Sequence, residues 1–86
     1  MNDKELVKIF KAMGNDRRFA ILKYLTQKKE LSVGKISELI NLSFKSVSRH
    51  LSVLYGAGLI ECRQSNTNRF YFINPDLSRD ITKFLN

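Results

Sequence analysis

The sequence predicts one small, mainly α-helical domain that carries a single β-hairpin. The chain has 86 residues, the length of one domain, and 43% of them are hydrophobic, which is typical of a folded domain rather than a disordered segment. Apolar residues recur at helical spacing along most of the chain. Near the C-terminal end, two short runs rich in β-branched and aromatic residues flank a polar turn, a pattern typical of a hairpin.

The first two predicted helices each begin at a residue whose side chain suits an N-cap. Asp3 is the expected cap of a helix over residues 3–13, where apolar residues recur every three or four positions. Asn15 or Asp16 is the expected cap of a second helix, which runs to about Gln27 and is followed by a polar loop.

The third and fourth predicted helices are close enough together to form a helix-turn-helix. Ser32 is the expected cap of a short helix over 33–40, and Ser43 caps a longer one over about 44–57. A short turn joins the two, as in the motif whose second helix lies in the major groove of DNA. The sequence therefore predicts a helix-turn-helix over about 32–57.

The hairpin is predicted directly after the helix-turn-helix. Its strands are expected at 59–64 and 69–73, because the four residues between them are of turn-forming types. A hairpin in this place is a wing, over about 59–73. With a closing helix, the expected order is α-α-α-α-β-β-α, a single winged helix-turn-helix domain over residues 1–86.

The closing helix is expected over about 75–86, because proline suits the first turn of a helix. Together with the helix over about 3–13, it has apolar residues that few other elements remain to cover. Either these two terminal helices cover each other in one chain or they pack across a homodimer interface; we favour the dimer. The candidate interface residues are Leu6, Ile9, Phe10, Leu77, Ile81, Phe84 and Leu85.

The charge distribution points to double-stranded DNA as a partner. The formal net charge is +7, and no acidic residue occurs between Glu38 and Glu61, the segment that contains the fourth helix. Serine, lysine and arginine side chains there can donate to phosphates and base edges, although a merely solvated polar face would have a similar composition. The candidate contacts are Ser43, Lys45, Ser46, Ser48, Arg49, His50 and Ser52 on the helix, and Arg63, Thr67 and Arg69 on the wing.

The cysteine and histidine content argues against several other functions. Cys62 and His50 are the only residues of their types, so an intramolecular disulfide or a four-ligand structural zinc site is not expected. No glycine-rich phosphate loop or nucleophile motif occurs, so we expect no enzyme activity and no cofactor. Cys62 is either a small packing residue or, beside a cation, a redox-sensitive thiol; packing is the more common role. No apolar run is long enough to span a membrane, and a cytoplasmic location is expected.

Two segments resemble the ArsR-type (ArsR/SmtB) family of transcriptional repressors. Residues 12–22, AMGNDRRFAIL, are similar to the signature of the family's second helix, and residues 43–60, SFKSVSRHLSVLYGAGLI, are similar to its recognition helix and the entry to the wing. The resemblance implies a homodimer built on the first and last helices. It also implies that the dimer binds an inverted-repeat operator and represses transcription by blocking polymerase.

The sequence departs from the metal-sensing members of that family. Where they carry a Cys-x-Cys pair at the start of the third helix, this chain has Ser32 and Gly34. The last helix offers Asp76 and Asp80 but no histidine for a second family site. We therefore expect no metal sensing. An organic effector between the end helices of the dimer stays open, as does a different function, in which the basic face binds an acidic protein.

Overall fold

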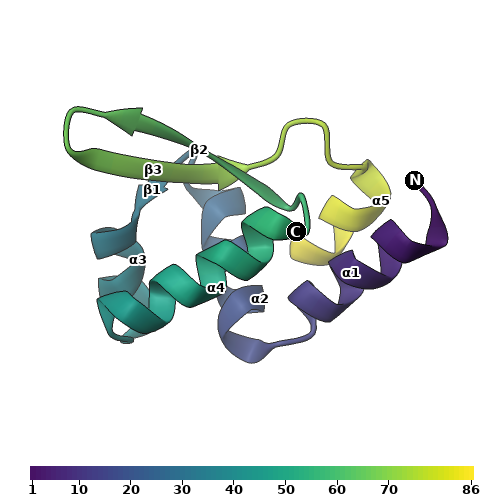
Figure 1. Cartoon of the computed structure of the whole chain (residues 1–86), viewed down its shortest axis with the longest axis horizontal. Coiled ribbons are helices and arrows are strands. Elements are labelled where there is room, and N and C mark those ends of the chain that lie inside the picture. Colours follow the sequence, from purple (N-terminus) through teal and green to yellow (C-terminus); the bar gives the residue numbers. More distant parts are fainter.

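Four α-helices, a small antiparallel sheet and a short C-terminal helix follow one another in the computed structural model, which describes residues 1–86 (Figure 1). This order confirms the predicted winged helix-turn-helix. The hairpin tip lies toward one end of the long axis and the first and last helices toward the other. The elements are α1 (Asp3–Met13), α2 (Asp16–Gln27), β1 (Leu31–Ser32), α3 (Val33–Ile40), α4 (Phe44–Gly56), β2 (Ile60–Ser65), β3 (Asn68–Ile73), α5 (Arg79–Thr82) and the 3-10 turn η1 (Lys83–Leu85).

Side-chain caps begin the helices, mostly where the sequence predicts them. The side chains of Asn15, Ser32 and Ser43 accept backbone N–H groups at the starts of α2, α3 and α4. The first cap was predicted one residue too late. Asn2 Oδ1 accepts the Glu5 N–H at 2.8 Å, whereas Asp3 is already in the first turn, where its negative charge complements the helix dipole.

The sheet has a third strand that the sequence analysis did not predict. Leu31 and Ser32 form β1, which pairs antiparallel with Tyr71 and Phe70 of β3, so the strand order is β1-β3-β2. A two-residue strand is too short to show an alternating pattern. Its formation depends on β3 lying beside it.

The hairpin is longer at its tip and shorter at its base than predicted. The pairing runs from Ile60 opposite Ile73 to Ser65 opposite Asn68, so only two residues remain in the turn. Leu59 is outside the strand and directly follows Gly58. The φ of Gly58, +78°, is the left-handed conformation that glycine adopts easily after the end of a helix.

The closing helix starts later than predicted. Asn74 Oδ1 accepts the Asp76 N–H at 2.9 Å and holds Pro75 in a turn instead of a first helical turn. The helix begins at Arg79, where Ser78 accepts the Asp80 N–H at 3.2 Å. The predicted helix over 75–86 is therefore reduced to α5 and η1.

The core is entirely apolar and draws on almost every element. All 16 buried residues are hydrophobic. None of the helices combines the length and hydropathy that crossing a lipid bilayer requires. The buried residues are Ile9, Ala12, Met13, Ile21, Leu22, Leu25, Leu31, Ile36, Ile40, Val47, Leu51, Leu54, Leu59, Ile60, Ile81 and Leu85.

Candidate nucleic-acid interface

Helix α4 divides into a buried apolar face and an open polar face. Its buried residues recur at helical spacing and fix which side turns outward. Tyr55 is 49% exposed, although it follows the buried Leu51 by four residues, a spacing that predicts burial. Of the predicted contacts on α4, Lys45, Arg49 and Ser52 are exposed, and Ser46, Ser48 and His50 are half-buried.

Two of the predicted DNA contacts, Ser43 and Ser46, form the N-cap of α4. Ser43 Oγ accepts the Ser46 N–H at 3.1 Å and lies 3.0 Å from the Ser46 hydroxyl. Phe44, the first residue of the helix, is 62% exposed. The N-terminal end of α4 thus presents an aromatic ring beside the serine that caps the helix.

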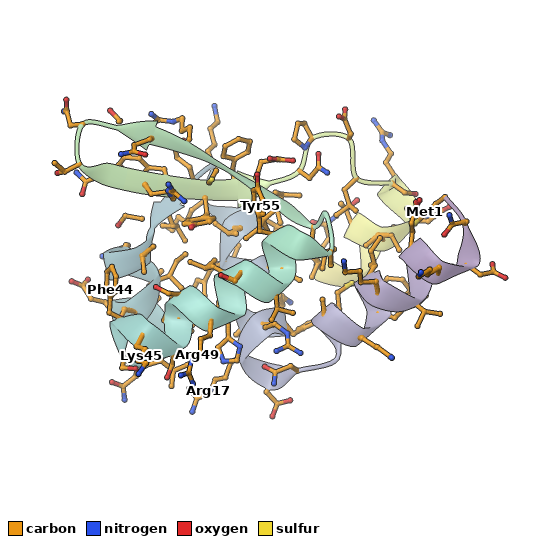
Figure 2. The ribbon with its side chains drawn as sticks, in the orientation of Figure 1. Met1, Arg17, Phe44, Lys45, Arg49 and Tyr55 are labelled. Carbon is orange, nitrogen blue, oxygen red and sulfur yellow. The ribbon has the colours of Figure 1, made fainter.

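A cation of α2 joins this face, and the sequence analysis did not assign it. Figure 2 shows the side chains of Arg17, Lys45 and Arg49 together at one side of the molecule. Arg17 Nη1 donates to the Ile40 carbonyl at 3.0 Å, which fixes the guanidinium beside the end of α3. One signal was present in the sequence: two arginines in the first turn of α2 oppose the helix dipole, which suggests a role other than helix stability.

The neighbouring Arg18 has a structural role and affects His50. Its Nε donates to the Ala12 carbonyl at 2.7 Å and so satisfies the C-terminal end of α1. Partial burial lowers the pKa of His50 below its usual 6.5, and the positive charges of Arg18 and Arg17 lower it further. His50 is therefore an uncharged donor and acceptor near neutral pH.

A groove lies between α4 and the wing. It has a volume of about 270 Å³. Ser52 and Tyr55 line it from α4, and Arg69, Tyr71 and Cys62 line it from the sheet. The structure thus brings the predicted contacts Ser52 and Arg69 to one groove, while Thr67 is exposed in the turn of the hairpin.

The guanidinium of Arg63 is paired with a carboxylate of the same chain. Its Nε donates to Glu30 Oε2 at 2.8 Å and its Nη2 donates to Glu30 Oε1. The guanidinium carbon also lies 4.8 Å from the centre of the Phe70 ring. The Arg63 guanidinium holds the pKa of Glu30 below its usual value, so this carboxylate is ionised at neutral pH.

The predicted dimer residues separate into a buried and an exposed group. Ile9, Ile81 and Leu85 are at most 4% exposed and belong to the core of the single chain. Phe10 and Phe84 are 48% and 61% exposed, and with the half-buried Leu6 and other residues they line an open groove of about 730 Å³. Leu77 lines a different pocket.

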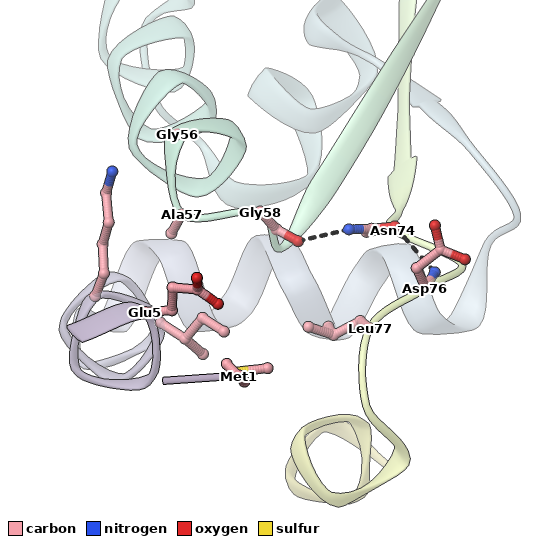
Figure 3. A pocket seen from close by; sticks show the side chains of 10 residues that line it. Met1, Glu5, Gly56, Ala57, Gly58, Asn74, Asp76 and Leu77 are labelled. Carbon is pink, nitrogen blue, oxygen red and sulfur yellow. Dashed lines mark hydrogen bonds between the residues drawn. The ribbon is translucent and has the colours of Figure 1, made fainter. Parts of the chain in front are cut away.

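That second pocket lies between α1 and the segment after β3 (Figure 3). It has a volume of about 350 Å³ and includes Ile9, Asn74 and Leu77. Asn74 Nδ2 donates to the Gly58 carbonyl at 2.9 Å across its rim.

The start of α3 lacks metal-ligating side chains. The hydroxyl of Ser32 is occupied as the helix cap, accepting the Lys35 N–H at 3.1 Å, and Gly34 has no side chain. No group of three or more histidine, cysteine, aspartate or glutamate residues is placed to share a metal ion in one chain.

Comparison with known proteins gives consistent matches along the chain. Residues 15–61 match the family model described as bacterial regulatory protein, arsR family. An uncharacterized HTH-type transcriptional regulator of Methanocaldococcus jannaschii is 33% identical over 82 residues, which cover 95% of this chain and 92% of the relative. The transcriptional activator HlyU of Vibrio cholerae is 38% identical over 73 residues, which cover 85% of this chain and 67% of that protein.

Solved structures show the same architecture. Reduced HlyU from Vibrio cholerae superimposes with a TM-score of 0.84 at 34% identity, covering 98% of this chain and 84% of that one. A solution structure from Mycobacterium bovis, described as a homodimeric winged helix-turn-helix DNA-binding domain, gives a TM-score of 0.83 at 26% identity, covering 99% of this chain and 81% of the other.

Proposed function

Because the chain belongs to the ArsR family of bacterial regulatory proteins, and is thus a DNA-binding transcriptional regulator and not an enzyme, we propose that it is a homodimeric repressor of an inverted-repeat operator. In this proposal α4 enters the major groove and the wing lies beside it. The protein acts in the cytoplasm, and the inducing signal is unassigned.

The observation that carries the DNA proposal is the exposed basic face of α4 and α2. Lys45, Arg49 and Arg17 point out on one side, and no carboxylate interrupts the chain between Glu38 and Glu61. Such a face attracts the phosphate backbone, and Arg49, in the middle of the exposed side of α4, is the residue we assign to a base edge. Lys45 and Arg17 are assigned to phosphates.

The homodimer proposal rests on two exposed phenylalanines. Phe10 of α1 and Phe84 of η1 line the same groove, and they leave an apolar face that a second copy would cover. The related Mycobacterium bovis domain is homodimeric. A two-fold axis there would place two α4 helices about 34 Å apart, one turn of duplex.

The most specific part of the proposal is that the protein represses transcription and does not activate it. A dimer that occupies a promoter excludes polymerase from it, so we propose that the protein represses by blocking access. The related HlyU is named an activator, and a promoter-fusion assay with and without the gene distinguishes the two outcomes.

We also infer that regulation does not use the metal ligands of the family's sensors. The engaged hydroxyl of Ser32 and the absent side chain of Gly34 support this inference. Zn²⁺, Cd²⁺ or arsenite, added to the protein–operator complex, should not release the DNA.

The first test is selection of bound duplexes from a randomised DNA pool at about 150 mM salt, where nonspecific charge attraction is partly screened. We expect an enriched inverted repeat whose half-site centres are about ten base pairs apart, or a multiple of that spacing. Tight binding at low salt without any enriched sequence would contradict the operator proposal. It would favour the other candidate function, binding of the basic face to an acidic protein.

A further inference from the structure

We propose that Glu30 and Arg63 form a positioning pair that holds the wing at a fixed angle to the helix-turn-helix, so that Arg63 acts on DNA binding through the wing and not by contacting DNA. This inference rests on the proposed function, because it assigns a role to two residues in the same DNA-binding surface. Glu30 is in the polar loop expected after α2, and the proposal gives Arg63 a role other than the DNA contact that the sequence predicts.

The geometry of the pair connects the wing to the rest of the domain. Arg63 is on β2 and Glu30 is in the connection that leads from α2 into β1. Two nitrogens of the guanidinium meet the two oxygens of the carboxylate, the bidentate arrangement that fixes both side chains in orientation. The pair therefore joins the outer strand β2 to a segment on the far side of β3.

Phe70 supports the arginine along this path. Arg63 and Phe70 are directly opposite each other on β2 and β3, and the guanidinium lies over the ring at 4.8 Å. Phe70 is also the partner of Ser32, the cap of α3. Arg63, two residues before the end of β2, is therefore at the register position where residues of all three strands pair.

The charges distinguish positioning from DNA contact. Glu30 is an acidic group within reach of the wing in a protein of net charge +7. If Arg63 were a phosphate contact, Glu30 would compete with the phosphate, and removing its charge would strengthen DNA binding. If Arg63 positions the wing, removing the charge of Glu30 releases the wing and weakens binding. The two roles predict changes of opposite sign.

The test measures operator affinity for Glu30→Gln, Arg63→Ala and the double variant, using the operator selected with the wild-type protein. We expect each single variant to bind about 3- to 10-fold more weakly, and the double variant no more weakly than either single one, as for residues that act as a unit. Arg63→Lys, which keeps the charge but loses the second nitrogen, should resemble Arg63→Ala. Tighter or unchanged binding by Glu30→Gln, additive losses, or wild-type affinity of Arg63→Lys would each overturn the inference.

Two further measurements separate positioning from loss of fold and from failure of the proposed function. The pair lies at the surface, with side-chain exposures of 49% for Arg63 and 33% for Glu30, so the urea midpoint of unfolding of Glu30→Gln should be close to that of the wild type. Arg69→Ala should weaken binding in the wild-type background and have little further effect in Glu30→Gln, because the released wing no longer presents Arg69. Absence of any selected operator would contradict the proposed function, whereas an operator bound equally well by Glu30→Gln would contradict only the positioning pair.

Discussion

Arg49 and Arg17 are two exposed arginines on the same face, but they are held differently. Arg17 donates to the Ile40 carbonyl, while Arg49 projects from the exposed side of α4 and forms no side-chain hydrogen bond or ion pair within the chain. A tethered guanidinium suits a phosphate at a fixed position, and a free one can adapt to a base edge. The difference yields a paired prediction.

We expect Arg49→Ala to weaken operator binding by about 1 to 3 kcal/mol and to relax the base preference at one position of each half-site. Arg17→Ala is the matched variant and should weaken binding to all sequences alike, with a salt slope smaller by about one. Fluorescence anisotropy titrations at several salt concentrations, on the operator and on a scrambled duplex, measure both effects. Equal losses on both duplexes for Arg49→Ala would reassign Arg49 to a phosphate.

His50 offers a pH measurement because it is the only histidine. Its pKa is lowered in the folded protein by burial and by Arg18 and Arg17, so the unfolded chain binds the proton more readily. The contribution of His50 to stability is therefore complete above pH 6.5 and declines as the pH falls from 6.5 toward the folded pKa. In NMR the imidazole signal should titrate with a midpoint below 6.5.

A matched variant isolates this effect from the carboxylates that also titrate in acid. The difference in urea midpoint between wild type and His50→Gln should change in favour of His50→Gln as the pH is lowered through that range. A titration midpoint above 6.5 would contradict the lowering of the His50 pKa by burial and by the two arginines.

At the scale of the secondary-structure elements, the start of α4 depends on one hydroxyl. Ser43→Ala removes the acceptor of the Ser46 N–H and should lower the free energy of unfolding by about 1 kcal/mol. Ser43→Thr keeps the hydroxyl and should be close to wild type, which a urea titration of both variants measures. If both variants lose DNA affinity but neither loses stability, Ser43 is a DNA contact and not mainly a cap.

The elements that the sequence predicted well are those fixed by local chemistry. Asn15, Ser32 and Ser43 cap helices because their side chains reach backbone N–H groups two or three residues away, a relation that is visible in the sequence. The core faces followed from helical spacing for the same reason. The fold and the polar face of α4 could thus be predicted without the structure.

The elements that were missed depend on partners far along the chain. β1 exists because β3 pairs with it. Asn74, whose side chain holds Pro75 in a turn through the Asp76 N–H, also donates to the distant Gly58 carbonyl. The ion pair between Arg63 and Glu30 was not predicted, because the two residues are 33 positions apart. Arg17 was not among the predicted contacts, because only the folded chain brings it beside α4. Contacts between residues far apart in the sequence leave no pattern in the residues around either of them.

At the scale of the whole molecule, the groove with Phe10 and Phe84 should decide the oligomeric state. Phe84→Ser should convert the dimer to a monomer in sedimentation velocity and should strongly weaken binding to the inverted repeat, while binding to a single half-site changes little. Phe44→Ser is the matched control, because Phe44 is 62% exposed against 61% for Phe84 but is on α4. A dimer that persists in Phe84→Ser, or that is lost in Phe44→Ser, would place the interface elsewhere.

Ser32 is at once the last residue of β1 and the cap of α3, and β1 pairs with β3 of the wing. The wing is thereby linked through one residue to α3, the first helix of the helix-turn-helix. We expect an inducing signal to leave the helix-turn-helix and wing of each copy intact and to change the distance between the two copies across the proposed dimer. The distance between the two α4 helices would then no longer match the distance between the half-sites. Each copy would still fit its own half-site, but the dimer could not occupy both at once and would release the DNA.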